Sequence, residues 1–216
     1  MRAQTARWVA GCIAAGSVAL IVAGLVLAYV DRHSLPAGQN TWNLADVFGQ
    51  VVNLAVPAVG FVLTSRRPAN RIGWVFLAAG LALGVTAFSL QYALRALVAA
   101  PGSLPAGRAF AWLSNWTWVI PFAMLAFLFL LFPTGRLHSR RWRPAAWFVG
   151  AVFVATVVDM IVRATRIWQD PFGSFTEAEN PAELTVLAFL IVATLVISVV
   201  AVVVRFARSS GDDGCS

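Results

Sequence analysis

The chain lacks lysine entirely and carries few charges of any kind, since only 12% of its 216 residues are charged. Hydrophobic residues make up 60% of the sequence. A water-soluble core of this size could not hide that much apolar surface, so lipid must be the main solvent of the chain. The composition therefore excludes a soluble domain and predicts an all-α integral membrane protein.

Cysteine and histidine are equally scarce, with two residues of each. Cys12 lies in the first apolar run and Cys215 in the tail, so we expect no disulfide between them. His33 and His138 lie outside the apolar runs, where they could supply neither a metal ligand nor a base within the membrane. The sequence also has no Gly-rich phosphate loop and no His-Glu-x-x-His pattern. We therefore expect no enzyme activity from this chain alone, no metal and no cofactor.

Six apolar runs are long enough to cross a bilayer as helices. The predicted spans cover residues 8–30, 47–64, 72–94, 110–132, 145–162 and 184–204, and residues 205–216 form a short cytoplasmic tail. Arg2 and Arg7 precede the first run and no small-residue cleavage site follows it, which favours a retained signal anchor. The sequence thus predicts one domain, a six-helix transmembrane bundle over residues 1–204.

Two short turns between the predicted spans are rich in arginine and set the expected orientation. The first holds Arg66, Arg67 and Arg71, and the second holds Arg136, Arg140, Arg141 and Arg143. Basic residues in short loops stay in the cytoplasm, so we expect both termini inside. Anionic headgroups or a partner protein, rather than nucleic acid, are the expected contacts of these arginines.

The second predicted span carries polar side chains at helical spacing. Asp46, Gln50, Asn53 and Pro57 share one helix face, which descends from the outer surface toward the middle of the membrane. Because Pro57 has no N–H, the carbonyl of Asn53 loses its helical donor. Two interpretations stay open. The face either binds a ligand, or it is a packing kink at which Gln50 and Asn53 hydrogen-bond neighbouring helices.

Two further residues near the outer ends of spans are candidates for the same ligand site. Trp116 belongs to an indole-rich stretch, which fits either an interfacial aromatic belt or an aromatic cage. Asp159 is the one acidic residue inside an apolar run, four residues before Arg163. It is either a functional intramembrane carboxylate or the partner of Arg163 in an ion pair. With no acidic neighbour in the membrane, it does not fit a paired-aspartate mechanism.

Small residues recur every four positions in two predicted spans. They are Gly11, Ala15, Ala19 and Ala23 in the first span, and Gly80 and Gly84 in the third. Small side chains let helix backbones approach closely, so we expect both sets to face neighbouring helices.

The two arginine turns also carry the most specific motifs in the chain. Residues 65–74 read Ser-Arg-Arg-Pro-Ala-Asn-Arg-Ile-Gly-Trp, and residues 131–144 read Leu-Phe-Pro-Thr-Gly-Arg-Leu-His-Ser-Arg-Arg-Trp-Arg-Pro. These turns resemble Arg-Arg-Pro-x-Asn-Pro-Ile-Gly-Trp and Leu-Phe-Pro-x-Gly-Arg-Leu-Pro-Ser-Arg-Arg-Trp-Arg in the multi-span input region of actinobacterial sensor histidine kinases. Arg71 and His138 stand where that family has proline, and neither change breaks a basic turn.

In that family the input region feeds a cytoplasmic dimerisation helix with the phosphorylated histidine, and then an ATP-binding domain. We expect residues 205–216 to leave no room for either, and we do not assign the phosphoacceptor role to His138, which lies in a short turn. The resemblance implies a truncated or stand-alone sensory or regulatory module of a bacterial plasma membrane, read by a separate kinase or another signalling chain. A small transporter and a gene remnant without function are the alternatives. The stimulus and the oligomeric state stay open.

Overall fold

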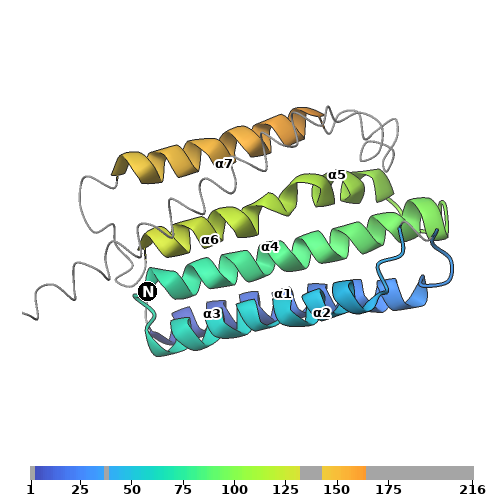
Figure 1. Cartoon of the computed structure of the whole chain (residues 1–216). Helices are drawn as coiled ribbons and strands as arrows, with labels where there is room; N and C mark the ends of the chain where they lie inside the picture. The colour runs from blue at the N-terminus through green and yellow to red at the C-terminus, as the bar shows by residue number, and fades with distance from the viewer. Residues whose placement is uncertain (1–2, 37–38, 132–142, 164–216) are drawn as a thin grey trace, which may run out of the picture.

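The computed structural model describes residues 3–36, 39–131 and 143–163, and all the regular elements in these ranges are helices. The elements are α1 (Ala3–Val30), α2 (Leu44–Asn53), α3 (Ala55–Arg66), α4 (Arg71–Leu94), the π-helical turn η1 (Arg95–Ala99), α5 (Gly107–Thr117), α6 (Val119–Leu131) and α7 (Arg143–Arg163). Figure 1 shows them lying lengthwise in one bundle. The predicted all-helical class is confirmed for the described residues.

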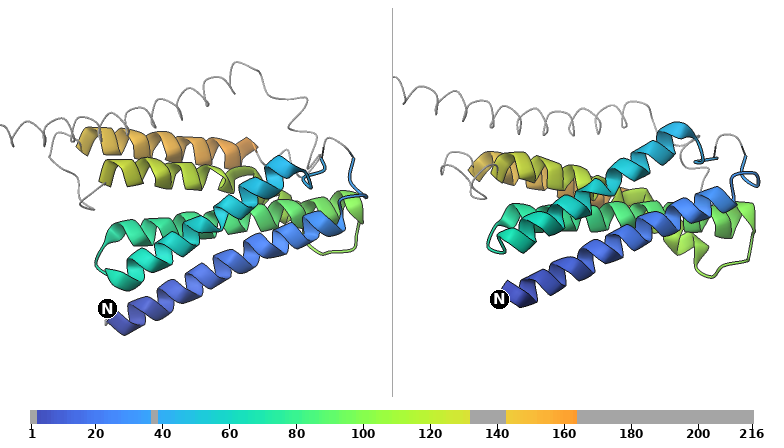
Figure 2. Two further views of the ribbon diagram at one scale, coloured as in Figure 1. Left: turned by 60° about the horizontal axis from the view of Figure 1, so that its bottom comes forward. Right: turned by 90° about the horizontal axis from the view of Figure 1, so that it is seen from below.

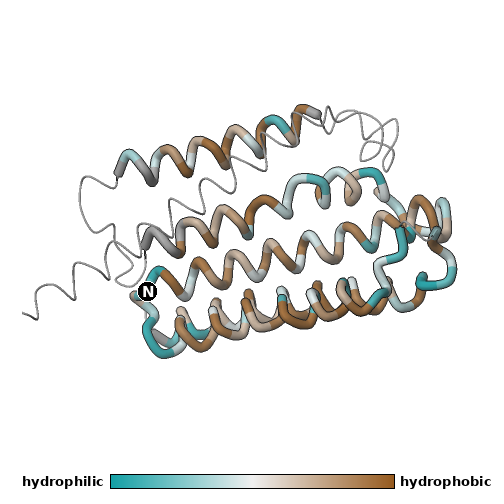
Figure 3. The backbone as a smooth tube through the Cα atoms, viewed as in Figure 1, coloured by the Kyte–Doolittle hydropathy of each residue, from teal (hydrophilic) through white to brown (hydrophobic). Residues whose placement is uncertain are grey.

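Four helical stretches are long and apolar enough to cross a membrane. They are Gln4–Val30, Leu44–Arg66, Arg71–Ala99 and Gly107–Ala126, while the apolar part of α7, Trp147–Val162, is shorter. Figure 3 shows hydrophobic residues along the middle of the helices and hydrophilic residues in most of the connecting turns. A bundle of membrane-spanning helices is the architecture that these lengths support. The sixth predicted run, residues 184–204, lies outside the described residues.

The helix ends define two ends of the bundle. The start of α1, the α3–α4 turn, the end of α6 and the start of α7 gather at one end, which we call the Arg66 end (Figure 1). There the Arg7 Nε donates a hydrogen bond to the carbonyl of Ser65 across 3.1 Å. We call the opposite end, where α1 meets η1, the Asp31 end. The segment with Arg7 and the α3–α4 turn with Arg66 and Arg67 therefore lie at the same end of the bundle.

α4 is the centre of the bundle, because it packs against α1, α3, α5 and α6. Figure 2 shows it between α1 and α6. Half of its apolar window is buried (50%), against 17–22% in the other three stretches. A Cβ added at Gly80 would lie 2.9 Å from the Pro57 Cβ, and one at Gly84 would lie 2.9 Å from the Ser17 carbonyl oxygen. The predicted packing role of Gly80 and Gly84 is thus confirmed.

The predicted small-residue stripe on α1 is wrong for Ala15 and Ala19, which are exposed in the described structure, whereas Ser17 and Ile21 are fully buried. Gly11 and Ala23 are half-buried. Gly24 continues the buried face, since a Cβ added there would lie 3.2 Å from the carbonyl of Ala87 on α4. The buried face alternates steps of four and three residues, which follow the helical period better than a strict step of four.

Two of the predicted spans are interrupted, each three residues before a proline. Leu54 separates α2 from α3, and Trp118 separates α5 from α6; the prolines are Pro57 and Pro121. Proline lacks an N–H and crowds the carbonyl four residues earlier, so the helical ladder is broken at that point. The carbonyls concerned belong to Asn53 and Thr117. A kink at Pro57 is one of the two interpretations of the sequence, whereas the interruption before Pro121 was not predicted.

Candidate ligand-binding groove

A cavity of about 360 Å³ opens between the two interrupted helices. α4 forms its floor, α2 with the start of α3 forms one wall, and α6 with Trp118 forms the other. α4 packs against both walls, whereas α3 and α6 share no extensive contact with each other. We call this cavity the α4 groove. Its lining residues are Gln50, Asn53, Val56, Phe76, Ala79, Leu83, Thr86, Ala87, Leu90, Trp118, Pro121, Phe122, Leu125 and Leu128.

The polar side chains of the α4 groove lie near the helix interruptions. In the last turn of α2, the Asn53 Nδ2 lies 3.5 Å from the Gln50 Oε1, a long hydrogen bond. Within the described ranges, neither amide bonds a neighbouring helix. On the floor, the Thr86 hydroxyl donates to the Thr117 Oγ1 (2.9 Å), whose own hydroxyl donates to the Leu113 carbonyl (2.8 Å). Because Gln50 and Asn53 bond only each other in the described structure, their amides have donors and acceptors left for a ligand.

The remainder of the α4 groove is apolar and aromatic. Trp118 and Phe122 pack edge to face, with ring centroids 5.9 Å apart and planes at 84°. Phe122 and Leu125 each leave 40% of their surface exposed, so this wall reaches the outer surface of the described helices. A concave site of this volume, mostly apolar with a few polar groups, is typical of small-molecule pockets.

Asp46, a predicted ligand residue, instead lies in the first turn of α2. Its carboxylate Oδ2 accepts a hydrogen bond from the Asn43 Nδ2 (2.6 Å), and its backbone N–H donates to the Asn43 Oδ1 (3.0 Å). Asn43 is the N-cap of α2, so the two residues satisfy each other as a capping pair. A carboxylate in the first turn also interacts favourably with the helix dipole. Asp46 is not among the residues that line the groove.

Trp116 and Asp159 also lie outside the groove lining. Trp116 packs edge to face against Trp112 at 5.5 Å, and its buried indole N–H has no partner among the described residues. The indole that does line the groove is that of Trp118. Asp159 is exposed on α7, and the side chain of Arg163, its predicted partner, lies outside the described set. Of the five predicted ligand residues, the structure brings together Gln50 and Asn53.

Thr86 and the groove wall around Pro121 were not predicted from the sequence. A repeated pattern could have found that wall, because a polar residue stands four positions before a proline twice within the predicted spans. The pairs are Asn53 with Pro57 and Thr117 with Pro121. Thr86 has no such pattern and becomes notable only through its hydrogen bond to Thr117.

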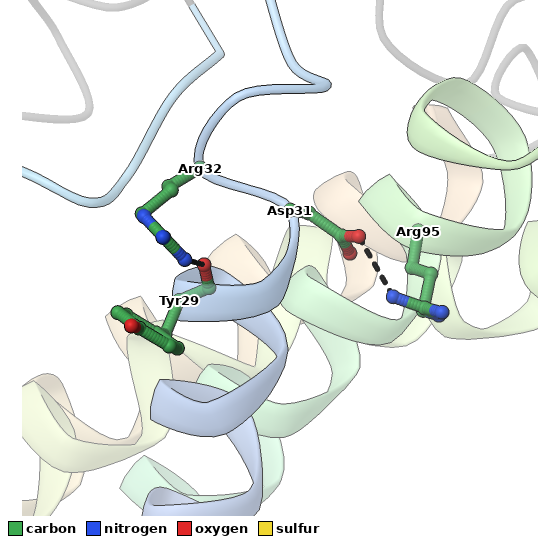
Figure 4. A network of polar contacts seen from close by, with 4 residues as sticks. All are labelled: Tyr29, Asp31, Arg32 and Arg95. Atoms are coloured by element: carbon green, nitrogen blue, oxygen red, sulfur yellow. Dashed lines mark hydrogen bonds and ion pairs between the residues drawn. The ribbon is translucent and has the colours of Figure 1, made fainter.

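An ion pair closes the Asp31 end of the bundle (Figure 4). The Arg95 Nη1 lies 2.7 Å from the Asp31 Oδ1, and Asp31 is only 5% exposed. Arg32 turns back over Tyr29, with its guanidinium carbon 3.9 Å from the ring centre. Arg95 begins the π-helical turn η1, an element that often marks functional positions in helices. The pair thus fixes the end of α1 to the end of α4.

The arginines of the α3–α4 turn are at the surface. Arg66, Arg67 and Arg71 are all exposed, as a contact with headgroups or a partner requires. In the second turn, Arg136, Arg140 and Arg141 lie outside the described residues, and Arg143 begins α7. Within the described ranges, no group of three or more His, Cys, Asp or Glu side chains could hold a metal ion.

The α4 groove, the two helix interruptions and the arginine turns are the features of this chain from which a function can be inferred. They combine a ligand-sized cavity with an interrupted helix on each of its two walls. Comparison with protein-family models, curated proteins and solved structures finds no match to the chain.

Proposed function

We propose that the chain is a sensory or regulatory module of a bacterial plasma membrane, with the α4 groove as its ligand site. A bound ligand would change the positions of the groove walls, and a separate kinase or another signalling chain would read the change. The observation that carries this proposal is a difference in packing between the two halves of the second span: α2 is poorly packed and α3 is closely packed. No residue of α2 is buried, whereas α3 buries Pro57, Gly60 and Thr64.

The closely packed half, α3, makes very close contacts with α4. A Cβ added at Gly60 would lie 2.8 Å from the backbone nitrogen of Leu77, and one at Gly73 would lie 2.5 Å from the Thr64 Oγ1. Packed interfaces of this kind resist gradual deformation. A ligand beside Gln50 would therefore displace α2 about the interruption and leave α3 in place.

The other groove wall offers a route to the arginine turns. α6 is interrupted from α5 at Trp118 and ends at Leu131, directly before the turn that holds Arg136, Arg140 and Arg141. A ligand that pushes on Phe122 would tilt α6 about this interruption and move the turn. The resemblance of both arginine turns to those of sensor histidine kinases supports the same direction of signalling.

We also propose six spans with both termini in the cytoplasm. The support is the gathering of the α1 start, the α3–α4 turn, and the adjoining ends of α6 and α7 at one end of the bundle, together with the positive-inside rule. In this orientation the Arg66 end is cytoplasmic and the Asp31 end faces outward.

Cysteine labelling in intact cells tests this orientation. Starting from a variant with Cys12 and Cys215 replaced by alanine, Ser103→Cys is expected to react with an impermeant maleimide. Asn70→Cys is expected to react only after the membrane is opened. Labelling of Asn70→Cys from outside would contradict the orientation, and equal labelling of both sites after opening provides the control for expression.

A small transporter is the second candidate, because interrupted helices around a cavity are how many secondary transporters build their substrate sites. Against it, the face below Asn53 continues as Pro57, Gly60 and Thr64, which are buried against α4 rather than open to a passage. Uptake of labelled amino acids, sugars and cations into vesicles separates the two functions. Reproducible flux that disappears in Asn53→Leu would overturn the sensory function.

Photocross-linking tests the proposed readout. A photoreactive amino acid at Arg67 is expected to capture one signalling chain in membranes of the native host, whereas the same residue at the exposed Val154 of α7 should capture none. The capture yield should change at least twofold in Leu125→Trp, which narrows the groove without touching the turn. Capture of no signalling chain, or a capture yield that is the same in Leu125→Trp as in the unmodified groove, would contradict the proposed sensory function.

A further inference from the structure

We infer that the α4 groove takes an uncharged, single-chain amphiphile, whose hydrogen-bonding head lies between Gln50, Asn53 and Thr86. This inference rests on the proposed function, because it names the ligand of the same site. Three observations carry it: the segregation of polar and apolar groups along the groove, the lack of charge in the described lining, and the volume of the cavity.

The register of α3 on α4 places the polar groups at one level of the groove. Thr64 lies against Gly73 and Pro57 lies against Gly80, seven residues further along α4. The second span and α4 therefore run antiparallel in a fixed register. One turn beyond Pro57, Asn53 falls level with the stretch that precedes Thr86. The amide pair and the Thr86 hydroxyl therefore meet near the two helix interruptions, toward the Asp31 end.

The groove below that level is wholly apolar in its described lining. From Leu83 to Phe76 the floor runs for about 10 Å at 1.5 Å per residue, and Leu125 and Leu128 form its side. A ligand with its head at the interruptions would thus lay an apolar tail toward the Arg66 end. Since α3 and α6 are not in extensive contact, the tail could enter sideways from the lipid.

Charge and size narrow the ligand class further. No charged side chain of the described residues lines the groove, so an ionised head would lose its hydration without a counter-ion, at a cost of several kcal/mol or more. The two amides, in contrast, can donate to or accept from a neutral alcohol, ester or amide, whereas the Thr86 hydroxyl, whose proton is used within the protein, can accept. A volume of about 360 Å³ corresponds to roughly a dozen groups of the size of water. That volume has room for one short alkyl chain.

Photolabelling of the full-length protein in phosphatidylcholine nanodiscs tests the inference, with a diazirine derivative of 1-decanol as the probe. We expect saturable labelling of the groove walls, mapped by mass spectrometry to residues 76–90 and 118–128. Unlabelled decanol should compete at least tenfold better than decyl sulfate or decyltrimethylammonium. Competition by either ion as strong as that by decanol would overturn the neutral class.

Two variants and one control make the test specific to the groove. Leu125→Trp fills the apolar part and should reduce labelling at least fivefold, and Asn53→Leu should weaken competition by decanol about tenfold. Val154→Trp adds the same bulk at an exposed position on α7 and should leave labelling unchanged. Labelling that does not saturate, or that both tryptophan variants reduce equally, would show that no such site exists.

The failure of this inference can be told from the failure of the proposed function. Saturable, charge-selective labelling without a groove-dependent cross-link at Arg67 would keep the amphiphile and overturn the sensory function. A groove-dependent cross-link without saturable labelling would keep the sensory function and overturn the amphiphile.

Discussion

Replacement of Gly80 by leucine is expected to destabilise the protein by about 3 kcal/mol, at the upper end of the usual cost of overpacking. A Cβ at this position would lie 2.9 Å from both Cβ and Cδ of Pro57 and 3.0 Å from its Cα. The pyrrolidine ring is rigid, so the helix backbones must separate. The midpoint of thermal unfolding, followed by size-exclusion chromatography in detergent, should fall by roughly 6–12 °C.

Gly16→Leu is the matched control for this substitution. It adds the same side chain to α1 at a position where nothing lies within 4 Å. Its unfolding midpoint should stay level or rise slightly, because leucine favours a helix more than glycine does. Equal losses in the two variants, or no loss in Gly80→Leu, would mean that α3 and α4 are not in close contact at Pro57.

Removal of the ion pair at the Asp31 end is expected to have the second largest effect. Asp31→Ala and Arg95→Ala should each cost about 2–3 kcal/mol, because each leaves its partner with an incompletely solvated charge. The lower value is expected for Asp31→Ala, since the remaining Arg95 side chain is 29% exposed and can be hydrated. Thermal unfolding of both variants in detergent, as above, gives these losses.

A double-mutant cycle isolates the contribution of the pair itself. The double variant Asp31→Ala/Arg95→Ala should lose at least about 1 kcal/mol less than the two single variants together. Arg108→Ala, which removes an exposed arginine from the neighbouring helix, is the control and should change stability by less than about 0.5 kcal/mol. Strict additivity of the two single losses would show that Asp31 and Arg95 do not interact.

Much of the helical framework could be predicted from the sequence, because the thickness of a bilayer sets the length of an apolar run. The described helices coincide with the first five predicted runs. Gly80 and Gly84 were identifiable for a similar reason, since close backbone approach demands small residues. The buried face of α1 was not, because Ala15 and Ala19 resemble Gly24 in size and only the position of α4 decides which of them is covered.

The groove could be predicted only in part. Gln50 and Asn53 stand out because amides are rare in apolar runs and because Pro57 follows at helical spacing. Thr86 and Trp118 join them through contacts between spans that are distant in sequence, and a single sequence does not encode which helix faces meet. Asp46 is a different case, since polarity at the right spacing suggested a ligand contact, whereas the structure shows the side chain paired with the N-cap residue Asn43.

The central position of α4 has a consequence for biosynthesis. α1 and the α2–α3 span leave the ribosome before α4, yet α4 is the helix against which α1 and α3 bury most of their contacts. Until Arg71–Leu94 has entered the membrane, α1 and α3 can pack only against each other, with small residues such as Ser17 and Gly60 left without their α4 contacts. A nascent chain that stops before α4 therefore presents quality-control proteases with unassembled helices, and the third span commits the bundle to its fold.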